Sequence, residues 1–307
     1  MHQPLVKYCD ISTEQLVFDL KWVIESPGLL IEPPPQINWE LLRDDYFNSC
    51  SVWLVDLEQN SKDLKSFFDQ DHQFILGKYF EMLIQFIFEN FEEFKLITKG
   101  LQVIKNNRTI GEIDFIFKNL KDNKTTHLEV AVKYYMGYKS SAKHTMWIGP
   151  NGMDNLAGKI QKFTTQLSMA MLAEELNELN TASFSRKVML KGYFFKHINS
   201  EQMPHFCNPD ALIGKWLYIS ELDNIIKPKS NFIIVPKRLW LGFYFDEDLE
   251  IFDSNLVVEI VNAEIQRVGK GILLAAIDES DNQIKTKYMV VPDRWPKLTL
   301  HRDKDQG

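Results

Sequence analysis

The sequence predicts a mixed α/β protein with one central sheet, whose core order is helix, three strands, helix and strand. Three observations support this fold class. Residues 67–90 carry apolar side chains at helical spacing. Residues 96–135 hold three strand-like apolar runs separated by polar turns, and residues 154–180 return to helical spacing before a last run at 188–196. We expect a helical extension before this core and an α/β extension after it.

Length and charge limit the classes of function. The chain has 307 residues, 45% of them hydrophobic and 25% charged, which is ordinary for a globular protein. We expect three parts: an N-terminal helical extension over 1–66, the core over 67–197 and a C-terminal α/β extension over 198–307. The formal net charge of −7 gives no overall attraction for nucleic acids, so any such site must be a local basic patch.

The cysteines and the N-terminus indicate the compartment. Cys9, Cys50 and Cys207 match no zinc-site spacing and cannot all pair with one another, which favours a reducing environment. The N-terminus lacks the basic start and apolar run of a signal peptide. No run approaches the roughly 20 apolar residues of a membrane helix. The sequence therefore predicts a cytoplasmic protein without membrane contact.

Capping and turn residues place the individual elements. Ser12 is a suitable cap for a helix over 12–24, and a second short helix is expected near 39–47. Asn106 and Asn107 predict a hairpin turn, because Asn tolerates left-handed backbone angles. The turns separate core strands expected at 96–104, 109–118 and 125–135, and Asp154 is placed to cap the helix over 154–180. In the C-terminal part we expect strands at 232–235, 242–245, 272–277 and 287–291 and a helix at 257–268.

Charged residues interrupt two of the core strands. Asp114 lies among Ile113, Phe115 and other apolar residues, and Glu129 and Lys133 alternate with apolar residues on the next strand. Side chains two apart on a strand share a face, so Glu129 and Lys133 project from the same side of the sheet. Burying such charges is costly unless they are paired or bind a cation. Carboxylate oxygens suit a hard metal ion.

The order of these elements and charges resembles the PD-(D/E)XK nuclease superfamily, which has the restriction-endonuclease-like fold. The segment Leu76-Gly77-Lys78-Tyr79-Phe80-Glu81 is similar to the first-helix motif of that superfamily. More narrowly, three segments resemble an uncharacterised bacterial family assigned to the superfamily: Gly111-Glu112-Ile113-Asp114-Phe115, Leu128-Glu129-Val130-Ala131-Val132-Lys133 and Trp147-Ile148-Gly149-Pro150.

The resemblance implies a nuclease that acts on DNA or, less favoured, on RNA. By position, Asp114 and Glu129 are the ligands of Mg²⁺, for which Mn²⁺ could substitute, and Glu81 is an accessory ligand or water anchor. Lys133 is the catalytic lysine of the motif, which orients the attacking water or stabilises the developing charge. The metal polarises the phosphate and activates the water.

The spacing of the motif departs from the superfamily pattern. Glu129 and Lys133 are four residues apart instead of two, which separates their Cα atoms by roughly 13 Å. Either Lys133 reaches back toward the acid, or the acid has moved while the lysine keeps its standard position. Lys159 and Lys162 on the following helix are alternatives for the lysine.

A basic segment follows the third strand. From Lys133 to Lys162 the chain has five lysines and one acid, Asp154, with aromatic residues interleaved. Lys159, Lys162 and Gln166 share a helix face, and Gln166 also resembles a glutamine of some nucleases of the superfamily. This composition suits phosphates and stacked bases. The predicted nucleic-acid contacts are Lys139, Lys143, Trp147, Lys159, Lys162 and Gln166.

Two other interpretations stay open. The chain could be a nuclease-like module that binds nucleic acid or protein without catalysis, as the displaced lysine suggests. It could also be an unrelated α/β protein in which Lys133 neutralises Glu129 as a structural ion pair. The position of the Lys133 amine relative to the two carboxylates distinguishes these interpretations.

Overall fold

The computed structural model describes residues 7–34, 37–139, 145–172, 181–200, 203–227, 230–244, 249–277 and 284–296. Its strands are β1 Glu40–Leu41, β2 Phe94–Lys105, β3 Arg108–Asn119, β4 Thr125–Lys139, β5 Thr145–Ile148, β6 Ser185–His197, β7 Leu212–Tyr218, β8 Asn231–Val235, β9 Phe252–Asp253, β10 Ile272–Ile277 and β11 Ile284–Val291. Its α-helices are α1 Thr13–Glu25, α2 Cys50–Gln59, α3 Lys62–Phe68, α4 Leu76–Asn90, α5 Leu156–Leu167 and α6 Val257–Val268.

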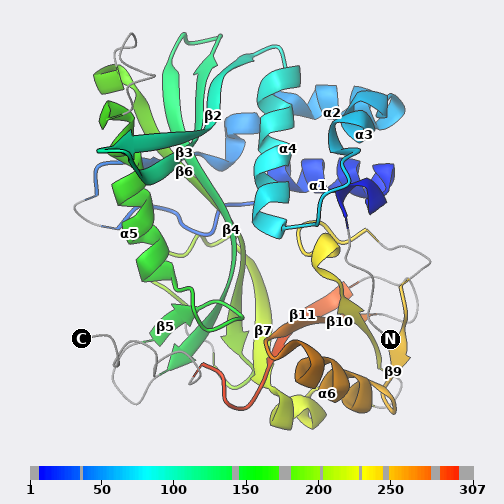
Figure 1. Cartoon of the computed structure of the whole chain (residues 1–307). Coiled ribbons are helices and arrows are strands. Elements are labelled where there is room, and N and C mark those ends of the chain that lie inside the picture. The colour runs from blue at the N-terminus through cyan, green and yellow to red at the C-terminus, as the bar shows by residue number, and fades with distance from the viewer. Residues whose placement is uncertain are drawn as a thin grey trace.

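The described strands form a single mixed sheet (Figure 1), which confirms the predicted mixed α/β fold with a large central sheet. The order is β2-β3-β4-β6-β7-β11-β10-β8-β9, with β1 beside β6 and β5 beside β4. Three pairs in this series are parallel: β4 with β6, β6 with β7, and β7 with β11. The remaining pairs of the main series are antiparallel. All three predicted parts of the chain contribute strands to this sheet.

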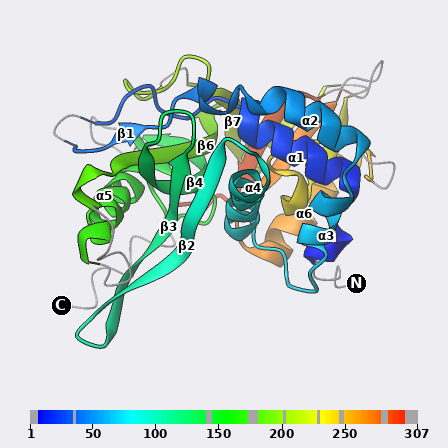
Figure 2. The same cartoon turned by 90° about the horizontal axis from the view of Figure 1, so that it is seen from above.

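Helices cover both faces of the sheet. Side chains alternate along β4, so Val130 and Val132 pack with α1 and α4, whereas Ala131 and Tyr135 pack with α5. Figures 1 and 2 show α4 and α5 on opposite sides of β4. A smaller apolar cluster joins α6 to β10 and β11. Of the helices in the described ranges, none is both long and apolar enough to cross a membrane.

Local signals predicted several elements well. Ser12 accepts a hydrogen bond from the Gln15 amide at 3.2 Å and caps α1. Asn106 and Asn107 have φ angles of 51° and 58° in the hairpin between β2 and β3. Helix α6 and strand β10 have the predicted bounds.

Other predicted bounds were wrong. The helix expected over 67–90 begins at residue 76, because α3 ends at Phe68 and the segment between is not helical. The helix expected near 39–47 is the two-residue strand β1 and a 3-10 helix over Asp44–Phe47. Residues 242–244 form no strand, since the amide and carbonyl of Gly242 bond to Asp19 and Gln15 of α1 instead. The sequence prediction missed α2, β5 and β7.

The helix expected over 154–180 also differs. It is α5, which begins at Leu156 behind the cap Asn155 and ends at Leu167. Asn155 accepts from the Gly158 amide at 2.8 Å, so the cap is not Asp154. A 3-10 helix over Met169–Leu172 follows, and 173–180 lie outside the described residues.

Candidate functional site

Strands β3 and β4 separate at the two acids that the sequence singles out. Their ladder ends where Phe115 lies opposite Leu128. Beyond that point, the Val130 amide donates to Asp114 Oδ2 at 2.9 Å, and the Asp114 amide donates to Glu129 Oε1 at 3.3 Å. The two carboxylates thus take the place of ladder hydrogen bonds where the strands diverge, and this brings them together.

Burial dominates the electrostatics of this pair. Glu129 is 0% exposed, and burial raises its pKa to about 7. Asp114 is half-buried, and burial together with the charge of Glu129 raises its pKa to about 7 as well. Desolvation disfavours the ionised form of each carboxyl, and like charges disfavour a doubly ionised pair. A cation between them would reverse both effects.

A buried histidine completes the acidic side of the site. His127 Nε2 lies 2.9 Å from Glu129 Oε1, and burial lowers the pKa of His127 to about 4. The imidazole is therefore neutral near pH 7, and its Nε2–H would donate to an ionised Glu129 carboxylate in the tautomer that carries this proton. His127 Nδ1 and Glu129 Oε2 have no hydrogen-bond partner within the described part of the chain. Buried polar atoms are normally paired, so these two atoms are available to accept a contact from an ion or a water.

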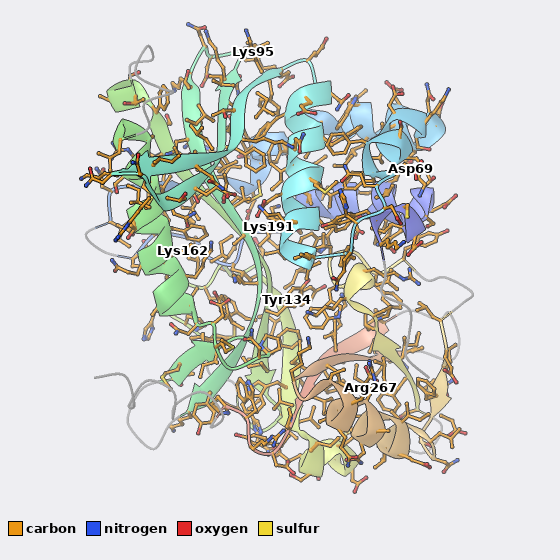
Figure 3. All side chains as sticks on the ribbon, in the orientation of Figure 1. Asp69, Lys95, Tyr134, Lys162, Lys191 and Arg267 are labelled. Atoms are coloured by element: carbon orange, nitrogen blue, oxygen red, sulfur yellow. The ribbon has the colours of Figure 1, made fainter. Side chains whose placement is uncertain are left out.

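The cations that face the acids come from α5. Lys159 and Lys162 both act to lower the pKa of Glu129, and Lys159 does the same for Asp114. Burial lowers the pKa of Lys159 itself to about 8, against the opposing effect of the Asp114 charge. Its amine lies 4.0 Å from the ring centre of Phe163. Figure 3 shows the more exposed Lys162 on α5.

Lys133 lies near enough for its charge to lower the pKa of Lys159, but its amine is paired with another acid. Its amine forms an ion pair with Asp154 Oδ2 at 2.5 Å, just before α5, and the described ion pairs link it to neither Glu129 nor Asp114. The four-residue spacing explains why Lys133 does not pair with Glu129, because the lysine lies four residues further along β4 on the same face. A structural ion pair between Glu129 and Lys133 is absent for the same reason. Sequence reasoning missed Asp154 as the partner of Lys133 and treated it as a helix cap.

Glu81 lies on α4 at the edge of the site. Its Oε2 atom is 2.7 Å from the amine of Lys78, which also lies 3.5 Å from Glu112 Oε1. Burial raises the pKa of Glu81, as do the charges of Asp114 and Glu112. Glu81 is therefore within electrostatic reach of Asp114, although Lys78 neutralises it.

The donor set can be compared with the needs of Mg²⁺. Among the described residues, no three His, Cys, Asp or Glu side chains are close enough together to hold a metal ion. Mg²⁺ in enzymes of phosphate chemistry is often held by one or two carboxylates, with waters and substrate phosphates as the other ligands. Asp114 and Glu129 fit that smaller requirement, and Glu129 Oε2 has no partner among the residues that the structure describes.

The predicted nucleic-acid contacts divide into two groups. Lys159, Lys162 and Gln166 lie on α5 near the acids, and Gln166 Nε2 donates to the Glu112 carbonyl at 3.2 Å. Lys139 is exposed at the end of β4, away from this group. Lys143 lies outside the described residues.

Trp147 does not fit its predicted role in base stacking. It is 7% exposed, packs against Gly137, and has its ring 4.8 Å from that of Phe194. The indole belongs to the apolar core beside α5, so its faces are not open to a base.

Comparison with known proteins identifies the family. A family model described as "Domain of unknown function (DUF1853)" matches residues 18–291. No curated protein and no solved structure matches the chain. The match includes every residue of the acidic site and confirms the expected relation to an uncharacterised domain family. The chain therefore belongs to the DUF1853 family of domains of unknown function.

Proposed function

We propose that this protein is a metal-dependent nuclease that hydrolyses phosphodiester bonds in DNA, with RNA as the second candidate substrate. The observation that carries the proposal is the pair Asp114 and Glu129. Two like-charged carboxylates meet where β3 and β4 separate, and lysines face them. One of the carboxylates has a buried oxygen without a partner in the described part of the chain. The proposal includes a restriction-endonuclease-like core, which the helix, strand and acid order supports.

The proposed metal ligands are Asp114 and Glu129, with Mg²⁺ as the ion and Mn²⁺ as a substitute. A bound ion of this kind polarises a phosphate oxygen and lowers the pKa of a coordinated water. Because burial raises the pKa of both carboxyls to about 7, the metal site is expected to bind weakly below that pH. Glu81 is too closely paired with Lys78 to be more than a water anchor.

We assign the role of the motif lysine to Lys159 instead of Lys133. Lys159 interacts with both carboxylates and approaches from α5, whereas Lys133 is held by Asp154. An ammonium group beside the reacting phosphate stabilises the negative charge that develops in the transition state. With a pKa of about 8, Lys159 is still mainly protonated near pH 7. Lys162 is exposed and suited to a backbone phosphate of the substrate.

A second function, nucleic-acid binding without catalysis, has its own support. The lysine of the motif is engaged with Asp154, and the described residues supply only two close carboxylates for a metal. A module of this kind would bind nucleic acid equally well with and without a chelator.

The test is a cleavage assay on the full chain with supercoiled plasmid, linear duplex, single-stranded DNA and RNA. We expect cleavage with Mg²⁺ or Mn²⁺, loss of cleavage in EDTA, and loss in Glu129→Gln. The control is Lys95→Ala, an exposed change on β2 that should leave cleavage intact. An absence of cleavage on all substrates, combined with chelator-insensitive binding, would contradict the nuclease and favour the binding module.

A further inference from the structure

The outer half of the hairpin formed by β2 and β3 leaves the central sheet. Strand β3 is paired with β4 only from Phe115 onward, whereas its pairing with β2 begins at Arg108. Within the described strands, residues 101–113 therefore form a two-stranded ribbon with no third strand beside it, and we call it the β2–β3 ribbon. Its root adjoins Asp114 of the acidic site, and its tip lies six positions away along β3, roughly 20 Å. Figure 2 shows this hairpin reaching beyond the other strands.

One face of the ribbon packs against the protein. Val103 and Ile113 are buried in a cluster with Met169 and Ala170 of the 3-10 helix that follows α5. Gly111 has no side chain where that helix approaches, and a Cβ there would lie 2.1 Å from Met169 Sδ. A two-stranded hairpin on its own is only marginally stable in water. This packing therefore holds the ribbon in a fixed direction beside the acidic site.

The tip of the ribbon is a two-residue turn. Asn106 and Asn107 have φ angles of 51° and 58°, as a tight hairpin turn of this length requires. Lys105 and Arg108 flank the turn as register partners. All four residues are exposed, and none of their side chains has a hydrogen-bond or ion-pair partner in the part of the chain that the structure describes. Their polar groups are thus free to contact a ligand.

The outer ribbon is basic, although the chain as a whole has a net charge of −7. Residues 100–111 include Lys105 and Arg108 and no acid. The first acid along β3 is Glu112 at the root of the ribbon, and its Oε1 atom lies 3.5 Å from the amine of Lys78. The charge that the tip presents to solvent is therefore positive, which favours a polyanionic partner.

The side chains of the tip are of the types that recognise base edges. Arg and Lys donate to guanine O6 and N7, and the Asn amide pairs with adenine N6 and N7. These atoms lie in the major groove of DNA, which is about 12 Å wide and admits a two-stranded β-ribbon. The major groove of an RNA duplex is deep and narrow, so side chains cannot read it. The ribbon therefore suits B-form DNA better than RNA.

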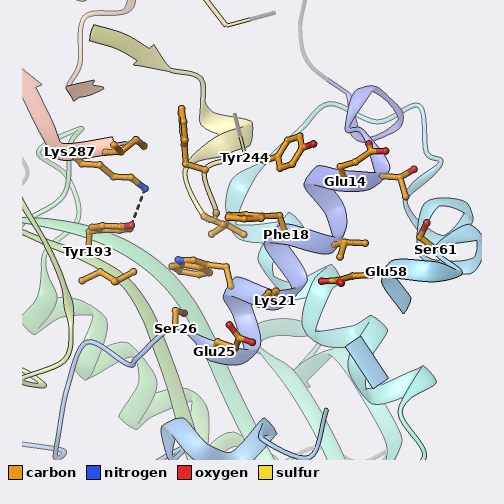
Figure 4. A pocket seen from close by; sticks show the side chains of 18 residues that line it. Glu14, Phe18, Lys21, Glu25, Ser26, Glu58, Ser61, Tyr193, Tyr244 and Lys287 are labelled. Atoms are coloured by element: carbon orange, nitrogen blue, oxygen red, sulfur yellow. Dashed lines mark hydrogen bonds between the residues drawn. The ribbon is translucent and has the colours of Figure 1, made fainter. Parts of the chain in front are cut away.

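A large pocket beside α1 has the wrong charge for a nucleic-acid backbone. Its volume is about 1240 Å³, and Figure 4 shows Glu14, Glu25 and Glu58 among the side chains that line it. Two of its described lining residues are lysines, and the charge of the buried Asp19 acts on one of them, Lys287. Phosphate groups are therefore disfavoured in this pocket, in contrast to the tip of the ribbon.

We propose that the β2–β3 ribbon enters the major groove of duplex DNA. Lys105 and Arg108 contact phosphates and guanine edges there, and the amides of the two turn residues between them contact base edges. Because the root of the ribbon adjoins Asp114, a duplex held at the tip also lies near the acidic site. This role of the ribbon rests on the proposed function and names a B-form duplex as its substrate. Groove contact needs no metal, so it can be measured apart from cleavage.

The first test is fluorescence anisotropy on the full chain in EDTA, with a DNA duplex, an RNA duplex of the same sequence and one strand of the DNA. We expect the DNA duplex to bind at least tenfold more tightly than either other ligand. The double variant Lys105→Ala, Arg108→Ala should weaken that binding at least tenfold and reduce the slope of log Kd against log salt by about 2. Equal binding of the three ligands, no binding of the DNA duplex, or binding that the double variant leaves unchanged would overturn the proposal.

Two further variants separate charge and turn geometry from base contact. The control Lys95→Ala, Lys124→Ala removes two exposed lysines from the opposite end of β2 and from the turn before β4, and it should change DNA binding less than twofold. Asn106→Gly, Asn107→Gly keeps residues that suit positive φ angles and removes only the two amides. This variant should fold as the unaltered chain does and bind the DNA duplex at least fivefold more weakly. Unchanged binding would overturn the base contacts of the turn.

Dimethyl sulfate footprinting on the same DNA duplex identifies the groove, because the reagent methylates guanine N7 in the major groove and adenine N3 in the minor groove. We expect the unaltered chain to protect guanine N7 and the double variant Lys105→Ala, Arg108→Ala to lose that protection. Protection of adenine N3 alone would overturn the assignment to the major groove. DNA binding through the ribbon by a chain that never cleaves would refute only the nuclease proposal. Metal-dependent cleavage with an unchanged KM in the double variant would refute only the role of the ribbon.

Discussion

Replacing Glu129 by Gln should stabilise the metal-free protein above pH 7, even though the residue is fully buried in the central sheet. The Gln Oε1 atom can still accept from the Asp114 amide and from His127 Nε2, so the polar contacts of that oxygen remain. The substitution removes only the buried charge. If Glu129 had a purely structural role in an ion pair, its replacement by Gln would instead lower the stability of the protein.

The magnitude follows from the pKa of Glu129, which burial raises from 4.5 to about 7. At about 1.4 kcal/mol per pH unit, ionising this buried carboxyl costs the folded state about 3 kcal/mol. The Gln amide group takes the place of Oε2, which has no partner in the described ranges, and an unpaired buried donor costs about 1–3 kcal/mol. The expected net gain in the free energy of unfolding is therefore about 0–2 kcal/mol at pH 8.

The sign depends on pH. The folded-state pKa is raised, so the stability that this carboxyl contributes is present at and below about pH 4.5 and is lost as the pH rises through about 7. Gln does not titrate, so the difference between the two proteins should grow by about 3 kcal/mol from pH 4.5 to pH 8. Removing the Glu129 charge also lowers the pKa of Asp114, which that charge helps to raise.

Urea unfolding followed by tryptophan fluorescence, in EDTA and in Mg²⁺, measures both effects. Mg²⁺ should stabilise the unaltered chain and leave Glu129→Gln unchanged, because the variant lacks one of the two ligands. Glu112→Gln on β3 is the control, since that side chain is 38% exposed and should change stability by less than about 0.5 kcal/mol. If Glu129→Gln destabilises the protein at pH 8 by more than 1 kcal/mol in EDTA, our account of the acidic site is wrong.

Three other predictions concern residues that the structure reassigns or reveals. Lys159→Ala should reduce the rate of nucleic-acid cleavage by about 10²–10³-fold and Lys133→Ala by less than about tenfold, and equal losses in a gel assay would contradict the assignment of Lys159. Asp19→Asn should reduce the fall in thermal stability between pH 5 and pH 8, because burial raises the pKa of Asp19 to about 7, while the fall due to Asp114 and Glu129 remains; an unchanged pH profile of Tm would refute this. Trp147→Ala should lower the free energy of unfolding by about 3–5 kcal/mol in urea, while duplex binding by the folded protein stays the same.

The sequence predicted those parts of the fold that depend on nearby residues. The hairpin between β2 and β3 follows from Asn106 and Asn107, which both adopt left-handed angles. Helix α1 follows from its Ser12 cap and its apolar stripe. The alternation on β3 and β4 was enough to place Asp114 and Glu129 on adjacent strands, because pleating fixes which side chains share a face.

Contacts between distant residues could not be predicted in this way. Lys133 has Glu129 four positions before it, yet it pairs with Asp154, which comes from a loop twenty-one positions later. Within the strand expected at 242–245, the described residues 242–244 form no strand because Gly242 bonds to two side chains of α1, more than two hundred positions earlier. A single sequence contains no signal for such pairings.

The divergence of β3 and β4 explains why the acids meet at this place in the sheet. Strand β4 stays paired with β6 from Thr126 to Met136, so β6 fixes the position of Glu129. On the other side of β4, the strand β3 turns away after the pair Phe115 and Leu128. A separating pair of strands leaves amides without ladder partners, and the Asp114 and Glu129 carboxylates accept from two of them. Apolar side chains at these positions would leave the same amides unpaired, so acceptors are needed here in any case.

Neutral acceptors would satisfy those amides without the cost of two buried charges. The side-chain oxygens of Asn and Gln also accept from an amide, and these neutral side chains do not repel one another. The acidic pair therefore lowers the stability of the metal-free fold, although neutral side chains could accept the same hydrogen bonds. A bound cation would restore that stability by mass action. Stability that rises with Mg²⁺ concentration in the unaltered chain and not in Glu129→Gln is thus the direct link between this sheet geometry and metal chemistry.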